Sequence, residues 1–351
     1  MSPRSGFAAA ALAIACVFAP AASPGSPSLA RLVGQTVITG MAGTQPSSAL
    51  LARIKAGQVG GVIFFAANIP TPSAAKALIG TLQQAAAAGG NPPLLVAVDQ
   101  EGGDVRRLPG PPDLSEAALG TLGSPAKAQA EGKAAGDYLR AIGVDVDLAP
   151  VLDTPSSPGN FLGDRAYSEN AQLNARLGPA FVAGLQSAHV AATAKHFPGL
   201  GTAPASTDVA HVYITTPKSD LEARLAPFRA AIRGGVKLVM VSNAGYRAFD
   251  PSGLPAVLSP RIVDGLLRTR LGYRGVVVSD ALEAPGPSGH PNTPELALRA
   301  GVDLLLYTAE STSAAGYGSA LAAARAGTLP LATLEAANAR IAALKQWLSR
   351  R

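Results

Sequence analysis

Short apolar runs alternate with longer amphipathic stretches along almost the whole chain. The apolar runs are rich in Val, Leu, Ile and Ala. They are continuous rather than strictly alternating with polar residues, which favours strands of a parallel sheet that is buried on both faces. Eight strands are predicted on this basis: Gln35–Gly40, Gly61–Phe65, Leu94–Val98, Val144–Leu148, Ala191–Ala194, Lys237–Val241, Gly275–Ser279 and Val302–Tyr307.

Segments rich in Ala, Leu and Arg separate these strands, and several begin at Ser or Thr and end at Gly, as capped helices do. The predicted helices are Ser47–Ala56, Ser73–Ala88, Ala126–Ala141, Glu169–Ala188, Ser219–Gly234, Ser259–Leu271, Thr293–Ala300, Ser313–Ala326 and Leu331–Leu348. Eight βα units predict an α/β fold, a (β/α)8 TIM-type barrel; a doubly wound open sheet has a similar signature. The stretch from Asp99 to Ser124, rich in Gly and Pro, is predicted to be one long loop.

Composition is consistent with one large domain, for which we take residues 31–351. The 351 residues are 48% hydrophobic and 15% charged, which supplies a sizeable core and excludes a disordered chain. The net charge is +6, but Lys and Arg are dispersed and aromatic residues make up only 5%. We therefore expect no nucleic-acid partner, and we expect the protein to act as a monomer.

Residues 1–30 have the layout of a signal peptide or lipoprotein leader with a short linker. Arg4 precedes a short apolar stretch, and small residues follow it. Cleavage after Ala21 would remove Cys16, the only cysteine; alternatively, Cys16 becomes the lipidated first residue of an anchored lipoprotein. Either alternative predicts an extracytoplasmic protein, secreted or attached to a membrane.

Polar residues stand at the ends of five consecutive predicted strands. They are Asp99 and Glu101 after the third strand, Asp153 and Arg165 after the fourth, Lys195 and His196 after the fifth, Ser242 and Asn243 after the sixth, and Asp280 after the seventh. Each alone is explained by a helix cap, a turn or an ion pair. Because the carboxyl ends of barrel strands meet at one mouth, the whole set favours an active site there.

The available side chains narrow the chemistry. The four His show no H-x-x-x-H spacing, and the chain has neither a G-x-S-x-G motif nor a Walker-type phosphate loop. We therefore expect no metal ion and no organic cofactor. Carboxylates, a few basic residues and glycines around one mouth suit glycoside hydrolysis, in which one carboxylate attacks the anomeric carbon and another group protonates the leaving oxygen.

Three motifs in order, VAVDQEGGDVRRLPG, AKHFPGLG and GVVVSDALEAPG, resemble glycoside hydrolase family 3, specifically its single-domain β-N-acetylhexosaminidase branch. The resemblance implies that Asp280 is the nucleophile of a retaining mechanism. It also implies that Asp99, Arg165, Lys195 and His196 bind the sugar. Gly102 and Gly103, having no Cβ, are expected to let the backbone approach the sugar ring.

Two residues are candidates for the proton donor, because the loop after Gly201 departs from the family pattern. In the family pattern, Pro-Gly-His-Gly is followed by Asp-Ser-His, and the His of this second motif is the acid/base. In this chain Leu200 replaces the first His, Asp208 stands where the acid/base is expected, and His211 lies three residues further on. Either Asp208 transfers the proton itself, which we favour, or His211 reaches in with Asp208 as its orienting partner.

The resemblance thus implies a retaining exo-β-N-acetylglucosaminidase that removes terminal β-linked N-acetylglucosamine from cell-wall-type glycans or muropeptides. Three alternatives remain. One is a β-glucosidase-like hydrolase, and another is a non-catalytic sugar-binding lipoprotein on the same scaffold. The third is an aldolase-type barrel in which Lys195 forms a Schiff base.

Overall fold

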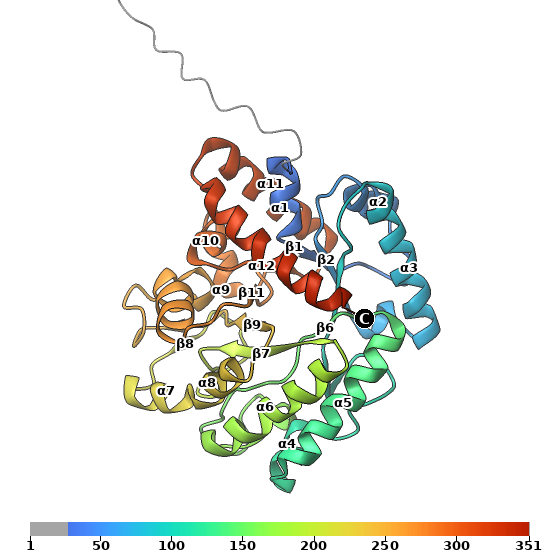
Figure 1. Ribbon diagram of the computed structural model, residues 1–351. Helices are drawn as coiled ribbons and strands as arrows, with labels where there is room; N and C mark the ends of the chain where they lie inside the picture. The colour runs from blue at the N-terminus through green and yellow to red at the C-terminus, as the bar shows by residue number, and fades with distance from the viewer. Residues whose placement is uncertain (1–26, 351) are drawn as a thin grey trace, which may run out of the picture.

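Eight parallel strands form the centre of the molecule and helices surround them (Figure 1). The computed structural model describes residues 27–350, so the predicted leader with Cys16 lies outside the described residues. The sheet order is β11–β9–β7–β6–β3–β2–β1–β12. The strands are β1 (Val37–Thr39), β2 (Gly61–Phe64), β3 (Leu95–Val98), β6 (Val146–Asp147), β7 (Ala191–Phe197), β9 (Leu238–Val241), β11 (Val276–Ser279) and β12 (Leu305–Tyr307).

The two end strands of this order meet and close the sheet. Val278 of β11 forms a parallel bridge with Leu304, and the Ser279 N–H donates to the Leu304 carbonyl at 2.9 Å. The predicted (β/α)8 barrel is therefore confirmed, and the open doubly wound sheet is wrong. All eight predicted strands are present, most of them shorter than predicted; β7 instead continues to Phe197 and includes Lys195 and His196.

The helices follow the predicted pattern apart from one division and three additions. The predicted helix Ser219–Gly234 is two helices, because Pro227 lacks the N–H that a continuous helix needs. Helices α1, α4 and α9 were not predicted. The helices are α1 (Leu29–Gln35), α2 (Ser48–Lys55), α3 (Pro72–Ala88), α4 (Glu116–Leu122), α5 (Pro125–Ile142), α6 (Ala171–Ser187), α7 (Lys218–Arg224), α8 (Ala226–Arg233), α9 (Pro285–Ser288), α10 (Thr293–Ala300), α11 (Glu310–Ala326) and α12 (Leu331–Ser349), with short turns η1 (Ala66–Asn68), η2 (Gly163–Arg165) and η3 (Ala256–Leu258) and a π-helical stretch η4 (Arg261–Arg270).

The predicted long loop from Asp99 to Ser124 contains regular structure. A hairpin of β4 (Gln100–Gly102) and β5 (Val105–Arg106) follows β3, and helix α4 comes next. Ser115 caps α4 by accepting a hydrogen bond from the Ala118 N–H at 3.2 Å. The Gly and Pro residues that suggested a loop lie in the turns between these short elements.

The strands separate two apolar layers, which explains why their sequences read as continuous apolar runs. Outward-facing residues pack under the helices, and inward-facing residues fill the barrel. The inner layer consists of Ile38, Ile63, Leu95, Ala97, Val146, Leu148, Ala191, Leu238, Met240, Val276, Val278, Leu304 and Leu306.

The C-terminal helix closes the bottom of the barrel. Ile341, Leu344 and Leu348 of α12 belong to the inner apolar cluster, and Figure 1 shows α12 lying across the strands. Apolar side chains of α12 thus cover the amino-terminal end of the barrel, where Arg340 of the same helix also pairs with the buried Asp303 at 2.8 Å. Among the described residues, no helix combines the length and apolar character needed to cross a bilayer.

We predict that Leu344→Ala lowers the free energy of unfolding by about 2–5 kcal/mol, because it opens a cavity beneath the barrel. Leu331 lies on the same helix but is 51% exposed, so Leu331→Ala is the matched control and should cost less than about 1 kcal/mol. Denaturant unfolding of both variants measures the difference. Equal losses would show that α12 does not support the inner core.

Candidate active site

A cavity of about 380 Å³ opens at the carboxyl-terminal end of the barrel, a volume in the range of small-ligand sites. Its floor is the top of the inner apolar layer, namely Ile63, Leu148, Met240 and Leu306. Its polar walls are Asp99, Glu101, Arg107, Arg165, Lys195, His196, Ser206, Thr207, Asp208, Asp280 and Thr308. The structure therefore brings together six of the seven candidate site residues from the sequence, and His211 is the one that does not line the cavity.

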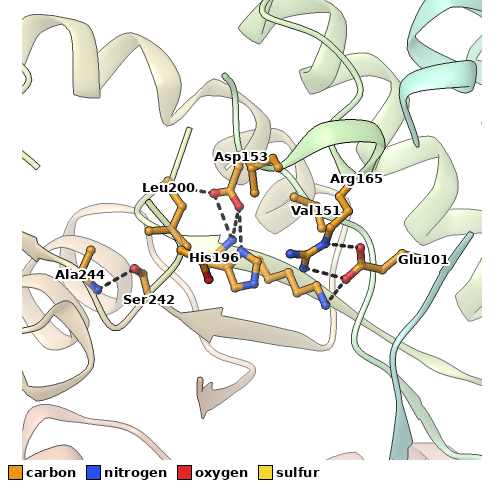
Figure 2. Close-up of polar contacts among 12 residues, drawn as sticks. Glu101, Val151, Asp153, Arg165, His196, Leu200, Ser242 and Ala244 are labelled. Atoms are coloured by element: carbon orange, nitrogen blue, oxygen red, sulfur yellow. Dashed lines mark hydrogen bonds and ion pairs between the residues drawn. The ribbon is translucent and has the colours of Figure 1, made fainter. Parts of the chain in front are cut away.

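Two carboxylates and two cations form an ion-pair network on one wall, which we call the clamp: Asp99, Glu101, Arg165 and Lys195. The Lys195 Nζ lies 2.8 Å from Asp99 Oδ1 and 2.6 Å from Glu101 Oε1. Arg165 donates two parallel hydrogen bonds to Glu101, at 2.8 and 2.9 Å (Figure 2). Glu101 was not assigned a role from the sequence, although it lies inside the first motif. Its contacts with Arg165 and Lys195 fix the orientation of both side chains more firmly than a single contact to each would.

The clamp is ionised on both sides. Burial by itself disfavours the charged carboxylates, but Lys195 and Arg165 outweigh it and hold the pKa of Asp99 and of Glu101 below their ordinary values. Burial likewise opposes the charge of Lys195, and Asp99 and Glu101 raise its pKa above the ordinary value. A Schiff-base lysine must be neutral to attack a carbonyl, so the aldolase alternative has no support in this site.

A second buried carboxylate, Asp153, holds His196. Asp153 Oδ2 lies 2.7 Å from His196 Nδ1, and Asp153 also accepts hydrogen bonds from the backbone N–H groups of His196 and Leu200 (Figure 2). Because Asp153 occupies Nδ1 of His196, the Nε2 atom of the ring is left for a ligand. The sequence placed Asp153 at a strand end without a role, and the structure shows that it orients the ring.

Asp280 follows β11 and points to the cavity that the clamp lines. Its Oδ1 accepts a hydrogen bond from the Ala281 N–H at 2.8 Å. Burial raises the pKa of Asp280, and Asp208 adds to that rise, whereas His196 and Lys195 act in the opposite direction. The side chain is thus a carboxylate in a desolvated site with a second carboxylate within electrostatic reach.

The loop after β7 brings Asp208 to the cavity and takes His211 away from it. Asp208 Oδ2 accepts a hydrogen bond from Ser206 Oγ at 3.1 Å, and Ser206 Oγ in turn accepts one from the Asp208 N–H at 3.2 Å. The ring of His211 instead packs on Tyr213, with 4.5 Å between ring centroids, and faces His290 at 6.4 Å. Of the two candidate proton donors, Asp208 alone lies at the cavity.

The beginning of this loop is fastened to the loop after β6. A Cβ on Gly201 would lie 1.8 Å from the Thr154 carbonyl oxygen, so only glycine allows the two backbones to touch. The Gly201 carbonyl accepts hydrogen bonds from the Ser156 N–H at 2.9 Å and from Asn160 Nδ2 at 3.2 Å. Further along, the loop is open to solvent, and Val209 is 76% exposed.

Gly102 and Gly103 do not have the role expected from the sequence, which was to let the backbone approach a sugar ring. Both have positive φ angles, 93° and 57°, but neither lines the cavity. A Cβ on Gly102 would lie 2.4 Å from the Leu114 carbonyl oxygen, and one on Gly103 would lie 2.0 Å from Asp164 Oδ2. These glycines turn the β4–β5 hairpin and seat it on neighbouring backbone rather than clearing space for a ligand.

Ser242 and Asn243, which the sequence placed at the mouth, are buried behind it. Asn243 Nδ2 donates to the Ala281 carbonyl at 2.8 Å, so it supports the residue next to Asp280. Ser242 Oγ accepts from the Ala244 N–H at 3.0 Å (Figure 2). Within residues 27–350, no cluster of three or more His, Cys, Asp or Glu side chains is arranged to hold a metal ion.

Comparison with known proteins gives consistent matches. Residues 29–344 match the model of the glycosyl hydrolase family 3 N terminal domain. The chain is 36% identical over 333 residues to an uncharacterized secreted glycosyl hydrolase of Arthroderma benhamiae, covering 92% of this chain and 94% of that one. It is 35% identical over 277 residues to a beta-hexosaminidase of Nitrosomonas eutropha, covering 73% of this chain and 75% of that one.

Among solved structures, the fold matches a glycoside hydrolase family 3 beta-N-acetylglucosaminidase from Paenibacillus sp. str. FPU-7, with a TM-score of 0.89 and 38% sequence identity. The match covers 92% of this chain but 63% of that one. The present chain therefore spans less than two thirds of the length of that relative.

We predict that Glu101→Gln lowers the free energy of unfolding by about 3–5 kcal/mol, because it leaves Lys195 and Arg165 buried without their carboxylate. The pKa of Glu101 is lowered from its ordinary value of 4.5. Its stabilisation is therefore complete above pH 4.5 and is lost as the pH falls through the lowered pKa. The difference between wild type and variant should narrow at acid pH in denaturant unfolding. Asp137→Asn, in an exposed pair with Lys133, is the control and should change stability by less than about 1 kcal/mol at any pH.

Proposed function

Because the chain belongs to glycosyl hydrolase family 3, we propose that it is a retaining exo-β-N-acetylglucosaminidase. The observation that carries the proposal is the meeting of Asp280, Asp208 and the sugar-binding side chains around one cavity. The reaction is hydrolysis of a terminal β-linked N-acetylglucosamine, with a covalent glycosyl-enzyme intermediate between its two steps.

Asp280 is the proposed nucleophile. A carboxylate oxygen attacks the anomeric carbon, and the bond to the leaving oxygen breaks as the ester to Asp280 forms. Burial strips water from this carboxylate, which favours attack, while nearby Lys195 and His196 oppose the effect of burial on its pKa. The net effect is a pKa of Asp280 above its ordinary value, and the mechanism requires the ionised form of this carboxylate.

Asp208 is the proposed acid/base. In the first step its proton goes to the departing oxygen, and in the second step it accepts a proton from the water that attacks the glycosyl-enzyme. Asp208 is an exposed cavity residue, so both the leaving group and water reach it. His211 lacks this position, which is why we assign the role to Asp208.

Asp99, Arg165, Lys195 and His196 are proposed to bind the sugar hydroxyls. All four line the cavity, and Glu101 and Asp153 hold three of them in place through bonds of 2.6–2.9 Å. Side chains that are fixed before the substrate arrives lose little conformational entropy on binding. The free energy of their charge-assisted hydrogen bonds is therefore available to orient the sugar ring.

The choice of N-acetylglucosamine rests on the names of the similar proteins, a beta-hexosaminidase and a beta-N-acetylglucosaminidase. A β-glucosidase-like activity is the competing proposal. Rates of hydrolysis of aryl N-acetylglucosaminide and aryl glucoside, measured side by side, distinguish the two. The complete set of cavity residues speaks for catalysis rather than for sugar binding alone.

We propose that the natural substrates are cell-wall-type glycans or muropeptides and that the protein works outside the cytoplasm, secreted or anchored through Cys16. The sequence of residues 1–30 supports this location. The description of the Arthroderma benhamiae relative as secreted supports it as well.

We predict that Asp280→Ala reduces turnover of aryl N-acetylglucosaminide on the order of 10⁴-fold or more, as loss of a covalent nucleophile does. Steady-state kinetics measure the rate, and mass spectrometry of wild type with a slowly released 2-fluoro sugar identifies the labelled residue. Normal turnover by the variant, or a label on another side chain, would contradict the assignment.

We predict that Asp208→Ala reduces turnover by about 10²–10⁴-fold for substrates with poor leaving groups, and less for activated aryl glycosides, which leave without a proton. Azide should restore the second step and yield the glycosyl azide, since it needs no base. His211→Ala should stay within about twofold of wild type, as surface substitutions do. If His211→Ala instead showed the large loss and azide rescue, His211 would be the acid/base.

The same variant tests the coupling between the two carboxylates. Asp208 raises the pKa of Asp280, and Asp280 must be ionised to attack, so activity is lost as the pH falls through that pKa. Removing Asp208 lowers the pKa of Asp280. The acid limb of the pH profile on an activated substrate should therefore move to lower pH.

A further inference from the structure

One buried acid near the clamp has no part in the reaction described so far. Glu116, the first residue of α4, is 1% exposed and does not line the cavity. Its Oε1 accepts a hydrogen bond from the Val151 N–H at 2.8 Å, and its Oε2 has no hydrogen-bond partner among residues 27–350. The charged groups that act on it are Glu101, Lys195 and Arg165 of the clamp. It also acts in turn on Tyr167, whose hydroxyl is likewise unpartnered within the described part of the chain.

The charge balance of this region favours a neutral Glu116. The clamp already contains two carboxylates, Asp99 and Glu101, held by Lys195 and Arg165. A third carboxylate would be buried with no cation of its own, which is strongly unfavourable. Burial raises the pKa of Glu116 well above its ordinary value, and Glu101 raises it further, against the opposing effects of the Val151 N–H, Lys195 and Arg165.

The single hydrogen bond of Glu116 lies at the junction of the clamp and His196. Val151 forms a parallel bridge with Lys195, and the next N–H, that of Leu152, donates to the Lys195 carbonyl at 2.6 Å. Asp153, which orients His196, follows directly. Figure 2 shows Val151 beside Arg165, between Asp153 and Glu101. A shift of Val151 would thus move the backbone of Lys195 and the carboxylate that holds His196.

We propose that Glu116 is a positioning residue for sugar binding, which acts as a neutral acid behind the clamp and fixes Val151. This role rests on the proposed function, in which the clamp and His196 hold the substrate. Ionisation of Glu116 would place a charge beside Glu101, compete with it for Lys195 and Arg165, and so weaken the grip on the sugar. The expected signature is a KM that rises at alkaline pH while kcat changes less.

Three variants test this. Glu116→Gln keeps the shape and the acceptor for Val151 but cannot ionise, and Glu116→Leu removes the acceptor. Glu131→Gln is the matched control: Glu131 is also buried and also accepts a backbone hydrogen bond, from the Asp113 N–H at 2.8 Å, but its charged partner is Lys127 rather than the clamp. KM and kcat for aryl N-acetylglucosaminide are measured across pH, with infrared spectra of the carboxylic acid C=O band.

We expect Glu116→Gln to keep the wild-type KM at acid and neutral pH and to lose the alkaline rise. Glu116→Leu should raise KM about tenfold, the scale of a lost buried hydrogen bond, and Glu131→Gln should leave the pH profile unchanged. One component of the infrared C=O band of protonated acids should be lost in Glu116→Gln and retained in Glu131→Gln. Burial also raises the pKa of Asp147 well above its ordinary value, so the component of Asp147 should remain in every variant.

The proposal is overturned if Glu116→Gln loses activity as Glu116→Leu does, since an ionised carboxylate would then be needed. It is also overturned if Glu116→Leu lowers only thermal stability, or if the infrared band is unaffected by Glu116→Gln. The band does not depend on turnover. Absence of hydrolysis by wild type would therefore remove the proposed function, while the band would still decide whether Glu116 is the neutral acid.

Discussion

The rest of the site depends on one buried ion pair, that of Lys195 with Glu101. Their side chains are 2% and 1% exposed and lie 2.6 Å apart. A buried ion persists only when it is paired and when its remaining hydrogen-bonding positions are filled. Arg165 fills them on Glu101, and Asp99 fills them on Lys195. The polar wall is therefore complete before any substrate arrives, and its geometry is fixed by the electrostatic needs of the protein itself.

The barrel makes this arrangement possible by keeping apolar and polar requirements apart. Its interior is filled with aliphatic side chains, and α12 closes the lower end with Ile341, Leu344 and Leu348. Stability at this end rests mainly on apolar contacts, together with one buried charged cluster in which Asp303 pairs with Arg268 and with Arg340 of α12 at 2.8 Å each. The other end carries the clamp, and the apolar layers offset the cost of burying these charges. Asp280 lies at this boundary, where burial raises its pKa and the nearby His196 and Lys195 oppose that rise.

The sequence was sufficient for the features that depend on local pattern. Continuous apolar runs predicted all eight strands, and polar residues at strand ends predicted which side chains meet. It was insufficient where long-range contacts decide. In the sequence Glu101 is part of a Gly-rich turn, and only the structure shows that it pairs with both Arg165 and Lys195. Helix α4 was missed because the surrounding Gly and Pro residues favoured a loop. The sequence left Asp208 and His211 as alternative proton donors, because which of them lies at the cavity depends on the path of a loop. In the structure His211 packs on Tyr213. The glycines after Glu101 were recognised as special, but their close neighbours, Leu114 and Asp164, are distant in sequence.

The loop that carries Asp208 is held at its start through Gly201 and again at its end, where the Val212 carbonyl accepts a hydrogen bond from the Gly245 N–H at 2.9 Å. Between these points the loop reaches into solvent, and Val209 is 76% exposed. The two ends of the cavity therefore differ in how much they can discriminate. The inner end is lined by side chains that buried ion pairs hold in place. The outer end is formed by a loop whose tip is exposed. For the proposed activity, recognition is therefore expected to depend on the ring that enters the cavity more than on the part of the substrate that extends beyond it.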